Sequence, residues 1–430
     1  MPAIVRYRRK ALSLTLLAVL ASNAFAQSTS TVAPNNSLII RAAHILDVRS
    51  GHYLNDMAIY VEGERIKVVG PAKKMELEQA PAGVRVIDLG GATVLPGLID
   101  CHTHLMASLP KGDNSYELNL LTKSEAYRAL EGAANARNTL LAGFTTVRDV
   151  ENEGSGYADL ALRDAINNGL VEGPRMLAAT RGIAAVGQYM PFNVSPDLSG
   201  FPTGAQMISG VEEARRAVRE QIGHGADLIK IYADWLHPTL TVAEMQVIVE
   251  EAHKANIKVA AHATTPEGIR NAVMAGVDSI EHGHHADRAV LQLMKSKGIY
   301  LVPTLSTVSP KSPALFDAAQ QTMHMAKELG VKIADGSDAS SVARHGKNAG
   351  ELEAMTQRGL TPIEAIRAAT FSAADLIGWS DKVGDLEVGK FADLIAVDGD
   401  PTVDITVLQK VVFVVKGGRV VKDRVTAPTF

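Results

Sequence analysis

The pattern of hydrophobic and polar residues divides this chain into two kinds of segment. Near its two ends, in the stretches 37–70 and 384–421, apolar and polar residues alternate over short runs separated by Gly and Asp-Gly turns. Such alternation is typical of strands with one buried face. Between these stretches, short apolar runs are separated by segments with apolar residues three and four positions apart, which is typical of amphipathic helices.

The central part contains eight candidate strands. The clearest helix, 209–225, has a serine that could cap its start and a glycine that could end it. Strands alternating with helices over roughly 250–300 residues predict a parallel (β/α)8 barrel, with its functional residues at the C-terminal ends of the strands. The predicted strands are Thr93–Asp100, Phe144–Asp149, Arg175–Ala179, Leu228–Tyr232, Lys258–His262, Ser279–His282, Tyr300–Thr304 and Lys332–Asp338.

The first residues have the features of an export signal. A basic segment precedes the apolar run Ala11–Ala21, and Ala24 and Ala26 form a small-residue cleavage pattern before Gln27. We therefore predict a signal peptide over 1–26 and export to a bacterial periplasm or beyond. The remaining chain is divided into 27–92 and 381–430, which form a small β-sandwich from both ends, and the barrel over 93–380.

Composition limits the classes of partner. The chain has 430 residues, 46% of them hydrophobic, a formal net charge of −4 and only 5% aromatic residues. Its length allows a large core, and its charge favours neither nucleic acid nor an anionic membrane surface. The single cysteine, Cys101, cannot form an intrachain disulfide, and we expect it to be a buried packing residue.

The segment 94–105, VLPGLIDCHTHL, is a predicted buried strand that ends in two histidines. Because side chains alternate between the faces of a strand, His102 and His104 point the same way, together with Asp100, while Cys101 points away. Two converging imidazoles provide half of a metal site, and imidazole suits zinc.

Four further polar residues lie at the predicted ends of other strands: Lys230, His262, His282 and Asp338. Taken singly, each has an ordinary structural explanation, since a lysine in an apolar strand can extend to the surface and an aspartate can cap the following helix. Six such residues at the strand ends of one barrel, however, favour a metal site.

These motifs resemble those of the amidohydrolase superfamily. The matches are PGLIDCHTH, Lys230 in the fourth strand, His262, EHG at His282 and GSDA at Asp338, with TTVRD, TPIEAIRAAT and GKFADLIAVDGDP elsewhere. Their order resembles the branch that contains imidazolonepropionase-like and Xaa-Pro dipeptidase-like enzymes. Within that branch, the chain resembles bacterial amidohydrolases that degrade ochratoxin.

The resemblance implies a binuclear site, usually of zinc. His102, His104 and Asp338 would hold one ion, His262 and His282 the other, and Lys230, carboxylated by carbon dioxide, would bridge the two. It also implies that a hydroxide shared by the ions attacks the substrate while Asp338 moves protons. Hydrolysis of an amide bond is the expected reaction.

Two departures from the family pattern affect the site. Many relatives have a Gly-Gly-His element after the third strand, where this chain reads GIAAVGQYM with Gln188 and Tyr189. The eighth strand carries Asp335 as well as Asp338, and we expect Asp335 to face away from the barrel axis.

The substrate is predicted only as a class: an N-acyl amino acid or a dipeptide with an apolar or aromatic C-terminal residue, including ochratoxin A. The alternatives are a prolidase, a one-metal deaminase or cyclic amidohydrolase, and a non-enzymatic binding protein. The chain is also expected to form homo-oligomers, as many members of the superfamily do. Candidate substrate contacts are Tyr189, Tyr232, Trp235, His285, Arg344 and His345.

Overall fold

The computed structural model describes residues 37–78, 84–109, 115–189, 195, 197, 200–235, 237–341 and 343–425. The predicted signal peptide lies outside the described residues. The described residues belong to one compact unit. Within the described ranges, no helix combines the length and the apolar character that crossing a membrane requires.

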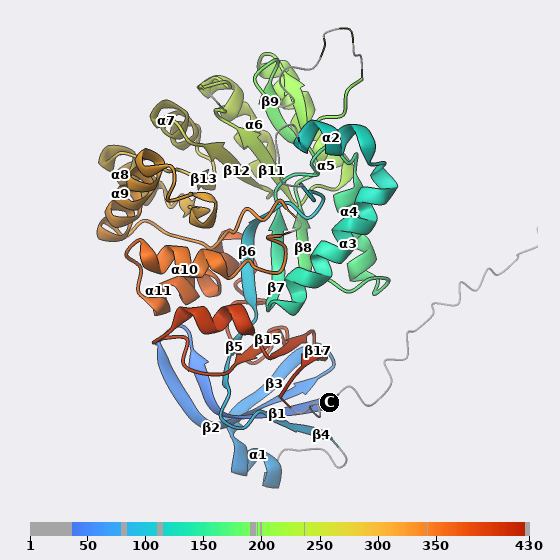
Figure 1. Cartoon of the computed structure of the whole chain (residues 1–430), viewed down its shortest axis with the longest axis vertical. Coiled ribbons are helices and arrows are strands. Elements are labelled where there is room, and N and C mark those ends of the chain that lie inside the picture. The colour runs from blue at the N-terminus through green and yellow to red at the C-terminus, as the bar shows by residue number, and fades with distance from the viewer. Residues whose placement is uncertain are drawn as a thin grey trace, which may run out of the picture. The chain divides into compact units, whose positions relative to one another are not determined.

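Strands from both ends of the chain form one mixed sheet (Figure 1), in the order β17-β16-β15-β5-β1-β2-β3, with β4 beside β1. Apolar residues from both ends, such as Ile40 and Phe413, belong to one buried cluster. Helix α1, Ala72–Glu78, follows β3. The strands are β1 (Ser37–Asp47), β2 (His52–Glu62), β3 (Arg65–Pro71), β4 (Arg85–Asp88), β5 (Thr93–Pro96), β15 (Leu394–Val397), β16 (Phe413–Lys416) and β17 (Arg419–Asp423).

The central part forms two parallel sheets, in the orders β6-β7-β8 and β10-β9-β11-β12-β13-β14. This is a TIM-barrel-like α/β fold, because parallel strands alternate with helices that lie on their outer side (Figure 1). The strands are β6 (Leu98–Thr103), β7 (Phe144–Asp149), β8 (Arg175–Ala178), β9 (Gly182–Ala185), β10 (Ala205–Ile208), β11 (Leu228–Tyr232), β12 (Lys258–Ala263), β13 (Ser279–His282) and β14 (Tyr300–Val302).

The helices of this part occupy the segments between and after the parallel strands. They are α2 (Ser115–Thr122), α3 (Glu125–Leu141), α4 (Ala158–Asn167), α5 (Val211–His224), α6 (Val242–Lys254), α7 (Pro266–Ala275), α8 (Arg288–Lys297), α9 (Pro313–Leu329), α10 (Gly350–Gln357), α11 (Pro362–Ala368) and α12 (Phe371–Leu376). Two short 3₁₀ helices cover Leu305–Thr307 and Ile405–Lys410.

Three predicted strands, β7, β11 and β13, have the expected bounds. The predicted strand Thr93–Asp100 was wrong as one element, because the chain changes sheets at Gly97. Here the Gly97 amide donates to Asp393, directly before β15 of the end sheet, whereas the Leu98 amide donates to Gly143. A Cβ at Gly97 would lie 2.1 Å from the Thr145 hydroxyl oxygen, so only glycine fits this crossing without rearrangement.

The predicted eighth strand, Lys332–Asp338, is not a regular strand. Its contacts with neighbours include a single parallel bridge between Ile333 and Leu301, and Asp338 has φ 52°, in the left-handed region. The predicted strand at Tyr300 ends early, at Val302. Proline at position 303 offers no amide hydrogen for a strand ladder.

The helix predicted over 209–225 is α5, and Gly225 ends it in the left-handed conformation, as expected. The prediction of a capping serine was wrong. The N-cap residue is Gly210, without a side-chain hydrogen bond, while the Ser209 amide donates to the Glu213 carboxylate at 2.6 Å.

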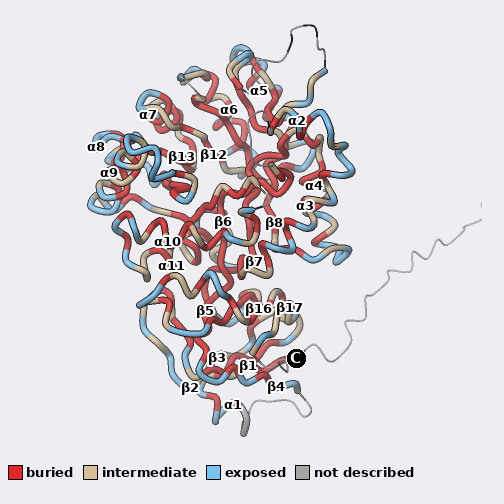
Figure 2. Tube along the Cα trace, viewed as in Figure 1, coloured by how far each residue is buried: buried red, intermediate tan, exposed pale blue. Residues whose placement is uncertain are grey.

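Buried residues concentrate along the strands, and exposed residues lie mainly on the outer faces of the helices (Figure 2). The prediction for Cys101 is confirmed. Its side chain is fully buried, with Sγ 3.9 Å from the Ala373 carbonyl oxygen. Burial raises the pKa of the Cys101 thiol, so this cysteine is not a reactive thiolate.

Candidate metal centre

One cavity of about 200 Å³ lies at the C-terminal ends of the parallel strands, where the strand directions bring their last side chains together. All six residues predicted as metal ligands line it: His102, His104, Lys230, His262, His282 and Asp338. Its remaining lining residues are Leu109, Tyr116, Glu153, Tyr189, Tyr232, Trp235 and Ser340.

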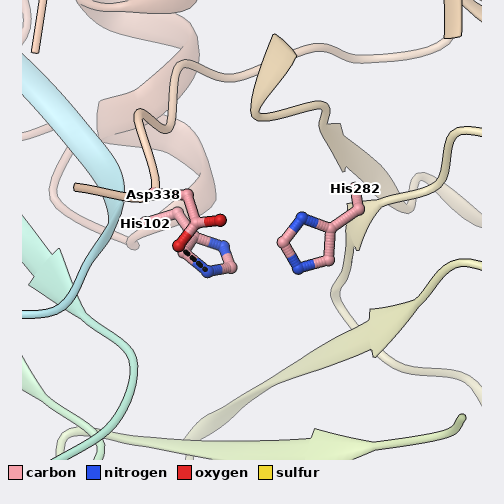
Figure 3. A group of neighbouring side chains, drawn as sticks. All are labelled: His102, His282 and Asp338. Carbon is pink, nitrogen blue, oxygen red and sulfur yellow. Dashed lines mark ion pairs between the residues drawn. The ribbon is translucent and has the colours of Figure 1, made fainter. Parts of the chain in front are cut away.

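Three of these side chains have donor atoms close enough to share one ion. Atoms of His102, His282 and Asp338 all lie within 4.8 Å of one another, and Figure 3 shows the His282 ring facing the other two. Asp338 Oδ1 lies 3.8 Å from His102 Nε2 and 3.3 Å from His104 Nε2. Imidazole nitrogens and a carboxylate oxygen form a suitable donor set for zinc.

The histidines from the later strands lie next to this group. The ring centroid of His282 is 4.5 Å from that of His262 and 5.0 Å from that of His102. Burial, followed by the charges of neighbouring groups, lowers the pKa of His262 and His282 well below the usual value. Both rings are therefore neutral near pH 7, which is the form that binds metal ions.

The backbone is strained at two of these positions. His282 has φ 70° and Asp338 has φ 52°, values that non-glycine residues rarely adopt. Such strain costs of order 1–3 kcal/mol and tends to occur at functional sites. Here it directs both side chains into the cavity that they line.

Lys230 is the most unusual residue of the site. It is 1% exposed on β11, yet no described residue forms a hydrogen bond or ion pair with Nζ, which lies 5.4 Å from the centre of the Tyr232 ring. Burial lowers the pKa of Lys230. A buried ammonium without a direct ion pair is costly, so the environment favours the uncharged form of this side chain.

Glu281, which we did not predict from the sequence, supports His102. Its Oε2 lies 2.7 Å from His102 Nδ1, and its Oε1 accepts a hydrogen bond from Arg148 at 2.8 Å. Both side chains of the His102–Glu281 pair are buried. The sequence signal was an acidic residue inside the apolar strand SIEH, where we considered only the neighbouring His282.

Two further acids, Glu151 and Glu153, follow β7 and were also missed. With His104 they form a second group whose ligand atoms lie within 4.8 Å of one another. Glu153 Oε1 lies 2.5 Å from His104 Nδ1. The sequence VENEG after the TTVRD motif contained both acids, but nothing in their spacing indicated which way they point.

The charges near Asp338 and His104 affect both groups. Burial acts to raise the pKa of Asp338, but the hydrogen bond from His104 and the charge of His102 hold it well below its usual range. Burial acts to lower the pKa of His104, but Glu153 and Asp338 raise it well above the usual value. Asp338 is therefore ionised near neutral pH and able to accept a proton.

Two other acids, Asp100 and Asp335, are close in sequence to the predicted ligands but do not line the cavity. Asp100 shares a strand with the histidines, but its carboxylate accepts hydrogen bonds from Ser337 and Asn348. Asp335 is fully buried, and neither carboxylate oxygen has a hydrogen-bond partner in the described structure. Burial and the charge of Asp100 raise the pKa of Asp335 well above its usual value.

The six candidate substrate contacts separate into two sets. Tyr189, Tyr232 and Trp235 line the cavity, whereas the other three do not. The His285 ring contacts the Thr264 carbonyl, Arg344 donates to Ser306 and Ser337, and His345 contacts the Ala107 carbonyl.

Comparison with known proteins gives consistent matches. The model of the amidohydrolase family matches residues 93–421. The ochratoxinase of Aspergillus niger is 33% identical, over 88% of this chain and 86% of its own. Its crystal structure superposes with a TM-score of 0.78, at 30% identity, covering 90% of this chain and 96% of its own.

A Xaa-Pro dipeptidase with bound methionine superposes with a TM-score of 0.80, at 33% identity, over 90% of this chain and all of its own. An imidazolonepropionase from Symbiobacterium thermophilum is 29% identical, over 84% of this chain and 91% of its own. Together with the histidines and the aspartate that converge at the strand ends, these matches show that the chain belongs to the amidohydrolase family and is a hydrolase of amide bonds.

Proposed function

We propose that the protein uses two divalent metal ions, preferably Zn²⁺, to hydrolyse the amide bond of N-acyl amino acids or dipeptides. The observation that carries this proposal is Lys230, a buried lysine without a counter-ion among histidines and an aspartate. Carboxylation would replace its ammonium group with an anionic oxygen ligand. His102, His104 and Asp338 would hold one ion, His262 and His282 the other, and carboxylated Lys230 would bridge them.

The chain's own residues have separate parts in this reaction. When bound, two divalent ions would lower the pKa of water and polarise the scissile carbonyl. Asp338, ionised and with a side chain 23% exposed, would accept a proton from the attacking water and pass it to the leaving amine. Glu281 would hold the His102 ring in the orientation needed for binding through Nε2.

The wall of Tyr189, Tyr232 and Trp235 favours a substrate with an apolar or aromatic group. The centroid of the Tyr189 ring lies 4.3 Å from the centroid of the Tyr232 ring and 5.2 Å from that of the Trp235 ring. The three rings therefore form one continuous surface. The similarity to a fungal ochratoxinase supports ochratoxin A, cleaved to ochratoxin alpha and phenylalanine, as an accepted substrate. The substrate would be a small molecule.

A second candidate function is prolidase activity. The similarity to a solved Xaa-Pro dipeptidase favours it, and it differs from the first proposal only in the leaving group. Comparing Xaa-Pro dipeptides with N-acyl-phenylalanines as substrates would separate the two. A one-metal deaminase or cyclic amidohydrolase would leave Lys230 without a role.

The fold proposal is a closed (β/α)8 barrel over 93–380, with a β-sandwich formed by 27–92 and 381–430. Backbone hydrogen bonds that link the edge strands β8, β14 and β6 to segments beyond their own sheets support closure: Asp227 donates to Ala178, Ala334 to Leu301, and Cys101 to Asp335. The buried cluster shared by both chain ends supports the sandwich. From the sequence and the family resemblance we also propose cleavage after residue 26, export and homo-oligomer formation.

The test is metal content by mass spectrometry, together with activity on an N-acyl-phenylalanine, for the wild type, Lys230→Ala and Lys332→Ala. Lys332 is half-exposed and paired with Asp375, so its variant is the control for loss of a lysine. Two metals per chain that fall together with activity only in Lys230→Ala would support the proposal. One metal per chain in the wild type, or activity indifferent to Lys230, would contradict it.

A further inference from the structure

We propose that Glu151 and Glu153 form an anionic subsite that binds a primary ammonium group of the substrate. This inference rests on the proposed function and narrows it, because it selects dipeptides with a free N-terminus over N-acyl amino acids.

Both acids are buried, and neither is paired with a lysine or an arginine of the described residues. Glu151 is fully buried and Glu153 is 7% exposed. No lysine or arginine of the described residues forms an ion pair with either carboxylate, and the nearby Arg128 donates instead to the carbonyl oxygens of Met106 and Glu153. Glu281 is equally buried, but it is paired with Arg148. A buried carboxylate needs compensating charge. Glu153 is paired with His104, whereas Glu151 has no ion pair among the described residues, and a ligand can provide the missing charge.

One unpartnered polar atom lies in the cavity wall near these acids. The hydroxyl of Tyr116, a residue 6% exposed in the cavity wall, has no hydrogen-bond partner among the described residues. His104 Nδ1, in contrast, forms an ion pair with Glu153 Oε1 at 2.5 Å. An ammonium group has three donors, and Glu151, Glu153 and the Tyr116 hydroxyl can provide their acceptors.

Glu151 does not line the cavity itself but is hydrogen-bonded to Tyr189 and Tyr232, which do. A Cβ at Gly204 would lie 1.8 Å from Glu151 Oε1, and a Cβ at Gly182 would lie 2.7 Å from the Tyr232 ring. The Tyr189 hydroxyl lies 3.0 Å from Glu151 Oε2, and the Tyr232 hydroxyl also donates to this oxygen. The aromatic rings beside the acids can add favourable contacts with a cation.

The position of the acids relates this subsite to the reacting bond. His104 is shared: Nε2 lies 3.3 Å from Asp338, while Nδ1 faces Glu153. A cation held by the acids would thus be separated by about one imidazole ring from the predicted metal-binding group. In a dipeptide, the α-ammonium is separated from the scissile carbonyl by a single carbon. This geometry points to the α-ammonium group.

The experiment compares L-alanyl-L-phenylalanine with N-propionyl-L-phenylalanine, which carries hydrogen in place of the ammonium group. For the metal-loaded wild type at pH 6.5, where an α-amine is mostly protonated, kcat/KM should be higher for the dipeptide by about tenfold or more. Equal kcat/KM values would overturn this inference and leave the proposed function standing. Absence of turnover of both compounds would contradict the proposed function itself.

Variants separate binding of the ammonium group from support of His104. In Glu151→Gln and Glu153→Gln, the ratio of the two kcat/KM values should fall towards one. The matched control is Glu281→Gln, which removes a buried carboxylate from another histidine and should slow both substrates alike. If Glu153→Gln and Glu151→Gln also slow both substrates by the same factor, the two acids do not bind the ammonium group.

Discussion

His102 and Glu281 form a buried pair in which Nδ1 of the imidazole lies 2.7 Å from a carboxylate oxygen, while Nε2 faces Asp338 at 3.8 Å. The carboxylate fixes the ring orientation and increases the basicity of the nitrogen on the opposite side. Arg148 and Ser279 in turn hold Glu281 through Oε1. The metal-binding potential of His102, on β6, therefore depends on residues from two other strands, β7 and β13.

Glu281→Gln should lower metal affinity and kcat/KM by about 10- to 100-fold, because a neutral amide orients the His102 ring less strongly. Metal titration and steady-state kinetics would measure both effects. Ser279→Ala is the control, since it removes a hydrogen bond from Glu281 but leaves its charge, and its effect should be smaller. Unchanged metal affinity in Glu281→Gln would show that the contact has no part in binding.

Asp338→Asn should lower kcat by about 10²- to 10⁴-fold, as expected for loss of a proton acceptor, whereas Asp335→Asn should retain activity. Asp335 is buried, lacks hydrogen-bond partners and does not line the cavity. Kinetics of both variants on an amide substrate would test the assignment. The opposite pattern would make Asp335 the functional acid of this segment.

The raised pKa of Asp335 also predicts an effect on stability. A carboxyl group whose pKa is higher in the folded than in the unfolded state destabilises the folded protein at pH values above the unfolded-state pKa. Ionisation of the group then favours unfolding. Asp335→Asn should therefore increase the free energy of unfolding at pH 7 by about 1 kcal/mol or more. The gain should shrink as the pH falls towards the unfolded-state pKa, and denaturant unfolding at several pH values would show whether it does.

Sequence periodicity predicted the elements that depend mainly on local pattern. Strands β7, β11 and β13 are short buried runs, and their last residues fall where the pattern placed them. The convergence of His102, Lys230 and His282 in one cavity followed from the rule that parallel strands direct their C-terminal ends to one side.

Contacts between residues that are distant in the sequence could not be predicted from this local pattern. The change of sheet at Gly97 depends on hydrogen bonds to Asp393 and Gly143, which no local signal reveals. The partner of Glu281 is 179 positions away along the chain. Similarly, Arg344 has a side chain suited to binding a carboxylate, but it is engaged with Ser306 and Ser337.

Gly204→Ala should destabilise the protein by about 1–3 kcal/mol, because a Cβ there would meet the Glu151 carboxylate. Gly223→Ala is the control: Gly223 lies in α5, and its Cβ would meet nothing within 4 Å. That variant should stabilise the protein by about 0.5–1 kcal/mol. Denaturant unfolding measures both values, and equal effects would mean that the close approach of Gly204 to Glu151 is not rigid.

The metal-free protein should lose stability as the pH falls from about 6.5 to about 4. His284 and His345 are buried against carbonyl oxygens, and burial lowers the pKa of each to about 4. Between this value and the unfolded-state value near 6.5, the unfolded chain binds protons that the folded chain does not, so acidification favours unfolding. Thermal unfolding of wild type and His345→Gln across this range tests the argument. The variant should show a weaker dependence on pH, since glutamine does not titrate, and identical slopes would mean that His345 does not remain neutral in the folded state.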